Sequence, residues 1–111
     1  MWRWYARIRT ALARCTVRIQ KHVVLDGRPC DGAYDPETNT IVLRRAVLER
    51  SVDEAVLVVL HEAVHAAGID EEVLVNEVLD RLAFRSASCR YAAAKRILEA
   101  LVRGESEPEE D

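Results

Sequence analysis

The sequence lacks the segments that carry a chain into or across a membrane. Its longest apolar run, residues 55–60, is far shorter than the roughly 20 residues that span a bilayer. Residues 1–9 mix arginines with aromatic residues and contain no apolar core of signal-peptide length. We therefore predict a cytoplasmic protein with no membrane partner.

Cysteines are few and internal repeats are absent. Cys15, Cys30 and Cys89 are an odd number without metal-site spacing, which favours a reducing compartment over a disulfide framework. The 111 residues, half of them apolar, suffice for one domain with one core. We predict a single domain over residues 1–104 and a disordered acidic tail over residues 105–111.

Charge is divided unevenly along the chain. Residues 1–50 carry ten Lys and Arg against five Asp and Glu, whereas residues 51–111 carry six against fourteen. The basic half begins with an aromatic, arginine-rich segment that could contact nucleic acid. The net charge of −3 argues against a dedicated nucleic-acid binder, so nucleic-acid association remains an alternative.

The first half of the chain predicts a helix and a sheet. Apolar residues at helical spacing indicate an amphipathic helix over residues 4–15. Alternating apolar residues indicate strands over residues 17–25 and 40–43, with turn-forming sequences between them. We expect a small antiparallel sheet of two or three strands. Residues 44–50 fit either a helical turn or a loop.

The second half predicts three helices. Ser51 and Glu54 have the spacing of a capping box, in which each side chain satisfies the other residue's backbone donor. The helix that follows, residues 55–67, is apolar on nearly every side and should be buried. Further helices are expected over residues 71–84 and 89–102. The predicted fold class is α+β, with a small sheet before the buried helix.

That buried helix carries His61, Glu62 and His65 in the pattern H-E-x-x-H. Residues four apart lie one turn above each other, so both imidazoles can reach one ion, and Glu62 can reach a ligand of that ion. Zinc accepts imidazole nitrogens and keeps a position for water, from which a neighbouring carboxylate can take a proton. Three unpaired polar groups on an apolar helix would otherwise cost free energy. We expect a zinc site with Glu62 as general base.

Residues 51–80 resemble the zincin metallopeptidases, and most closely their compact single-domain gluzincins. The resemblance implies a zinc peptidase that hydrolyses a peptide or protein substrate. It also suggests that the strand at residues 41–43 is a sheet edge that pairs with the extended substrate. An alternative is a metal-binding regulatory or interaction module that lacks turnover. Oligomeric state is left open.

The third zinc ligand must be a carboxylate, because no histidine follows His65. If the two helices form an antiparallel hairpin, Glu77 lies nearly level with the histidines. Glu77 follows Asn76 and precedes Asp80, similar to the gluzincin Asn-Glu pair and its bracing aspartate. We therefore expect Glu77 as the third ligand and Asp80 as its support. Glu71, which partly matches a metzincin pattern, and Glu72 remain alternative ligands.

Four other side chains are weaker candidates. His22 could bind metal or stabilise an oxyanion, Tyr34 or Tyr91 could polarise a carbonyl, and Cys30 could cap the zinc. In each case an ordinary packing or surface role is the more frequent one for such a residue.

Overall fold

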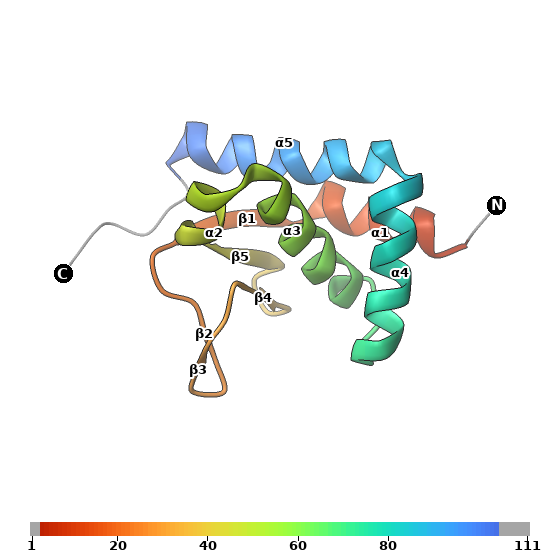
Figure 1. Ribbon diagram of the computed structural model, residues 1–111, viewed down its shortest axis with the longest axis horizontal. Coiled ribbons are helices and arrows are strands. Elements are labelled where there is room, and N and C mark those ends of the chain that lie inside the picture. The colour runs from red at the N-terminus through yellow and green to blue at the C-terminus, as the bar shows by residue number, and fades with distance from the viewer. Residues whose placement is uncertain (1–2, 105–111) are drawn as a thin grey trace.

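The computed structural model describes residues 3–104, apart from the side chains of residue 3 and residues 83–85. In the first part of the chain one helix is followed by five short strands, and the rest of the described chain is helical (Figure 1). The elements are α1 (Arg3–Arg14), β1 (Thr16–Gln20), β2 (Val24–Leu25), β3 (Arg28–Pro29), β4 (Gly32–Asp35), β5 (Thr40–Arg44), α2 (Arg45–Arg50), α3 (Val52–Ala66), α4 (Glu72–Arg85) and α5 (Ala87–Arg103). The predicted α+β class is confirmed.

The main sheet is mixed, with the strand order β1-β5-β4. β4 pairs with β5 antiparallel, as expected for neighbouring strands, but β1 pairs with β5 in parallel. The prediction of an antiparallel sheet was therefore wrong for one of its two ladders. The reason is that the chain leaves the sheet after Gln20, forms the separate β2–β3 hairpin, and returns as β4 at the far edge. The alternation of apolar and polar residues within a strand does not show where the chain re-enters the sheet.

The strand predicted over residues 17–25 is consequently split in two. Val17 and Ile19 are buried in β1, whereas Val24 and Leu25 are exposed in the hairpin. Asp26 and Gly27 turn the hairpin with positive φ angles of 53° and 77°, the backbone that a tight two-residue hairpin turn requires. The hairpin projects below the sheet in Figure 1.

The core lies between the sheet and α3, with α1 and α5 packed around that helix. Residues opposite one another in the sheet share a face, so Val17, Ile41 and Leu43 all point toward the helices. All three are almost fully buried, as are Val59, Leu60 and Val64 of α3. The prediction that α3 is a buried helix is confirmed by its packing against α1, α2, α4, α5 and the sheet.

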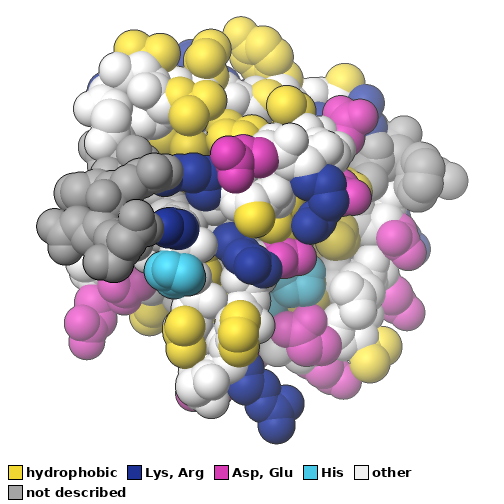
Figure 2. Space-filling view, turned by 60° about the vertical axis from the view of Figure 1, so that its left-hand side comes forward, with side chains coloured by type: hydrophobic (Ala, Val, Ile, Leu, Met, Phe, Trp, Pro, Cys, Tyr) yellow, Lys and Arg dark blue, Asp and Glu magenta, His cyan; other side chains and the backbone are white. Residues whose placement is uncertain are grey.

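Among the residues that the structure describes, no helix combines the length and the apolar character needed to cross a membrane. The basic aromatic start of the chain is only partly described, because Trp2 lies outside the described range. The acidic tail predicted over residues 105–111 also lies outside that range. On the face shown in Figure 2, Lys and Arg side chains are interspersed with Asp and Glu, and hydrophobic side chains gather along α5 at the top.

Candidate metal centre

The candidate site is built on the last two turns of α3. Ser51 caps the start of this helix, since its hydroxyl accepts a hydrogen bond from the Glu54 backbone N–H at 3.2 Å. The helix ends at Ala66, shortly before Gly68, whose φ of 103° suits glycine far better than any other residue. A straight helix between these two signals places His61 and His65 one above the other. Their ring centroids are 5.0 Å apart.

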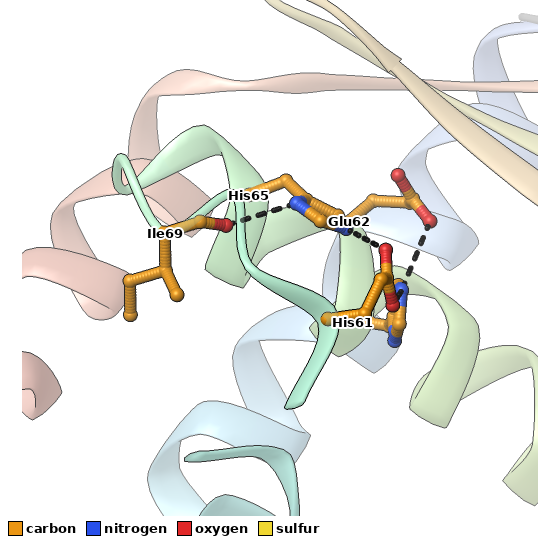
Figure 3. Close-up of polar contacts among 5 residues, drawn as sticks. His61, Glu62, His65 and Ile69 are labelled. Atoms are coloured by element: carbon orange, nitrogen blue, oxygen red, sulfur yellow. Dashed lines mark hydrogen bonds and ion pairs between the residues drawn. The ribbon is translucent and has the colours of Figure 1, made fainter. Parts of the chain in front are cut away.

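Both imidazoles are partly exposed at the surface of an open cleft. The side chain of His61 is 26% exposed and that of His65 is 20% exposed. The His65 ring faces Ile69, whose backbone oxygen lies 2.9 Å from His65 Nδ1 (Figure 3). A carbonyl can only accept, so Nδ1 of His65 donates. In a neutral ring, Nε2 then carries the lone pair that a metal ion needs.

Glu72, in the first turn of α4, is the carboxylate that approaches both histidines. Its Oε1 lies 3.0 Å from His65 Nε2, and its Oε2 lies 3.5 Å from His61 Nε2. Ligand atoms of His61, His65 and Glu72 all lie within 4.8 Å of one another. Ligands at the usual zinc distances are about 3.3 Å apart at the corners of a tetrahedron. The three donors are therefore close enough together to hold one metal ion.

Glu77, the expected third ligand, is not brought to the histidines. It follows Glu72 by five residues, which places it about 140° around α4 and about 7.5 Å along the axis. The buried face of α4 contains Val75 and Val78, and Glu77 is exposed on the other side. The expectation relied on an antiparallel hairpin centred at Ile69, whereas α4 begins only at Glu72 and brings its first turn to the site.

The other α4 carboxylates are also outside the group. Asp80, expected to brace a ligand, is exposed on the same side of the helix as Glu77. Glu71 is the residue just before the helix and is exposed; its side chain makes no capping hydrogen bond. Of the three glutamates considered from the sequence, the structure brings Glu72 alone into the group that could hold a metal.

Glu62 lies beside the histidines but is buried more deeply. Its side chain is 12% exposed, and its Oε2 is 3.9 Å from His61 Nε2. Burial raises the pKa of Glu62, an effect that the positive charge of a protonated His65 opposes. Burial likewise lowers the pKa of His61, against the attraction of Glu72. The site thus favours a neutral His61 and a Glu62 that is more basic than an exposed glutamate.

The cleft in front of these residues extends on both sides of His61 and Glu62. One hollow of about 620 Å³ is lined by His65, Glu72, Tyr34 and Leu25, among others. A second, of about 340 Å³, is lined by apolar residues that include Leu57, Val58 and Leu79. Both hollows share Gly32, His61 and Glu62 as lining residues. An elongated ligand could therefore lie across the candidate metal centre.

β4 forms the wall of this cleft and is an edge strand of the sheet. The prediction that residues 41–43 form the open edge was wrong, because β5 lies between β1 and β4. The Arg44 backbone N–H donates to the Asp31 carbonyl at 2.8 Å. By alternation along an antiparallel ladder, the backbone N–H and C=O groups of Gly32 and Tyr34 then point away from β5. These groups face the side on which a ligand strand could add.

The four weaker candidates are not part of the group that could hold a metal. His22 is exposed in the segment after β1, and Tyr91 is 71% exposed on α5. The Tyr34 side chain lines the cleft, but its hydroxyl donates to Asn39 Oδ1 at 2.8 Å. The Cys30 thiol donates to the Val23 carbonyl, and burial together with the charge of Glu62 raises the pKa of this thiol.

Two features of the site were not foreseen from the sequence. One is Gly32, where a Cβ would lie 2.5 Å from Val58 Cγ1 and 3.6 Å from Glu62 Cγ, so β4 approaches α3 more closely than a side chain allows. The other is the Ile69 carbonyl that orients His65. A glycine within a strand pattern is a sequence signal for close approach. A backbone carbonyl leaves no such signal.

Comparisons with protein families, with curated proteins and with solved structures found no match to this chain.

Proposed function

We propose that this protein is a zinc-dependent peptidase with His61, His65 and Glu72 as zinc ligands and Glu62 as general base. The observation that carries the proposal is the convergence of both imidazoles on a single carboxylate. With His65 Nδ1 donating to Ile69, a neutral His65 ring turns its Nε2 lone pair toward the Glu72 carboxylate, an arrangement that a metal ion between them would stabilise. One proton cannot serve both His61 and His65, whereas one metal ion can.

The chemistry proposed for the site divides between the metal and the chain. Bound zinc would act as a Lewis acid that polarises the scissile carbonyl and lowers the pKa of a water. Glu62 would accept the proton of that water and later deliver it to the leaving amine, a role that its raised pKa favours. The outward backbone groups of β4 would hold the peptide extended across the cleft.

This proposal keeps the zincin-like interpretation of the sequence but changes the third ligand. Glu72 replaces Glu77 because its carboxylate lies beside both histidines, while Glu77 is exposed on another face of α4. The mixed sheet with β4 at its edge and α3 behind it is the supporting framework. A carboxylate that does not bind the metal, Glu62, favours catalysis over a purely structural ion.

The test combines metal content with hydrolysis of a fluorescent casein substrate. Purified protein should bind about one zinc ion per chain, and His61→Ala should lose it. Glu62→Gln should retain zinc and lose hydrolysis. His22→Ala, which removes the remaining exposed histidine, is the matched control and should change neither. A wild-type protein that binds no zinc would refute the proposal, and zinc binding without hydrolysis would favour the binding module instead.

A further inference from the structure

A basic hollow of about 450 Å³ adjoins the metal cleft. Arg7, Thr10 and Arg14 line it from α1, and Asn39 and Ala66 line it from the opposite side. Ala66 also lines the metal cleft, and Tyr34 of the cleft donates its hydroxyl hydrogen bond to Asn39 of the hollow. A ligand that follows β4 past Tyr34 would therefore reach the basic hollow.

Arg7 and Arg14 present two positive charges on one face of α1. They are seven residues apart, so two helical turns, about 10 Å, separate them along the axis. Both are exposed, and within the described part of the chain neither makes an ion pair with a carboxylate. The Arg7 guanidinium stacks over the Trp4 ring at 4.8 Å, a contact that limits where it can point. The hollow therefore offers guanidinium donors to an anionic ligand.

The charged side chains that line the adjoining metal cleft indicate which class of anionic ligand fits best. Asp70 and Glu72 line the cleft, and a ligand with a charge at every unit, such as a nucleic acid, would be repelled along this path. A peptide carries charge only at its acidic side chains. Its backbone also matches the outward N–H and C=O groups of Gly32 and Tyr34.

We propose that Arg7 and Arg14 select peptides that place acidic side chains beyond Tyr34 as they lie along β4. The inference rests on the proposed function in that it concerns the same cleft. It defines the substrate class as acidic peptide segments. The positive charge lies away from the metal ligands, so it governs recognition and takes no part in bond cleavage.

Binding is tested with two fluorescent peptides that share an uncharged segment and differ only at one end, where one has glutamates and the other has glutamines. Fluorescence anisotropy should show that wild type binds the glutamate peptide more tightly. The double variant R7Q/R14Q should weaken that binding about tenfold and leave the glutamine peptide unchanged. R7K/R14K, which retains both charges, should keep most of the affinity. R18Q/R103Q, which removes two exposed arginines elsewhere, is the charge-matched control.

This experiment needs neither zinc nor turnover, so its failure is distinct from failure of the proposed function. Equal binding of the two peptides by wild type would refute the inference even if the protein hydrolyses casein. Tighter binding of a single-stranded oligonucleotide, lost in R7Q/R14Q, together with no preference for the glutamate peptide would assign the arginines to nucleic acid and also refute it. Circular dichroism of each variant confirms that the fold is retained.

Discussion

Gly32 is the residue at which the sheet touches the helix that carries the site. A methyl group at this position would meet Val58 Cγ1 at 2.5 Å and the Val42 carbonyl oxygen at 3.1 Å. Valine in a helix has one strongly preferred rotamer, so Val58 cannot turn away cheaply. The close approach keeps the outward backbone groups of β4 next to Glu62.

We expect Gly32→Ala to destabilise the protein by about 1–3 kcal/mol through overpacking. Urea unfolding followed by circular dichroism measures the change. Val58→Ala removes the clashing methyl, so the double variant should lose less stability than the sum of the two single variants. Additive losses would mean that β4 and α3 are not in the contact described.

The choice between Glu72 and Glu77 is a second question at the scale of single residues. Removing residues that only orient a metal ligand weakens metal binding by about 10- to 100-fold, so loss of a ligand should cost at least tenfold. Glu72→Gln should therefore weaken zinc binding by more than about tenfold, as measured by competition with a chelating dye. Glu77→Gln, the matched change on the exposed side of α4, should leave the affinity unchanged. The reverse result would restore the ligand expected from the sequence.

At the scale of elements, the start of α3 shows half of the expected capping box. The Ser51 hydroxyl accepts from the Glu54 N–H, as predicted. The Glu54 carboxylate does not return the bond, because it pairs with Arg50 at 2.7 Å, and the Ser51 N–H donates to the Val47 carbonyl of α2 instead. α2 thus runs directly into α3, and Ser51 serves as the junction of both helices.

Ser51→Ala should cost about 1 kcal/mol, because it removes the capping acceptor at the start of α3. For a domain of this size the loss lowers the melting temperature by about 4 °C, which differential scanning calorimetry resolves. Glu54→Gln should have a smaller effect, since the Arg50–Glu54 pair is exposed. A larger loss for Glu54→Gln than for Ser51→Ala would contradict this account of the junction.

The elements differ in how far the sequence predicted them. The helices now called α1, α3, α4 and α5 were predicted within a few residues of their bounds. The prediction of α1 came from apolar positions at helical spacing, and that of α3 from its capping box and its apolar character. His61, Glu62 and His65 followed from spacing within one helix. Glu72 and the edge position of β4 did not, because they depend on where the chain returns after a turn. Such pairings between distant segments leave no local pattern.

At the scale of the whole molecule, the candidate ligands join two helices that are otherwise connected by residues 67–71. His61 and His65 come from α3 and Glu72 comes from α4. α4 buries Val75, Val78 and Leu82 against the core, but its outer face is exposed. A shared metal ion would therefore restrain the first turn of α4, which has no side-chain capping hydrogen bond from Glu71.

Zinc binding to the folded protein should raise its stability by about 2.7 kcal/mol at a free zinc concentration 100 times the dissociation constant. Thermal unfolding with and without zinc measures this shift, and amide hydrogen exchange should show the added protection concentrated in the first turn of α4. The Glu72→Gln variant should lose most of the shift. Uniform protection across the chain would indicate that the ion does not bridge the two helices.

The open edge of β4 also bears on self-association of the folded chain. An unpaired strand edge is a template on which a second copy can add, and long, flat, apolar edges promote aggregation. β4 is short, Asp31 stands before it, and Asp35 and Pro36 stand at its end. Proline cannot donate a backbone hydrogen bond, so Pro36 ends the ladder that a second copy could form on this edge. These features disfavour pairing between the β4 edges of two copies.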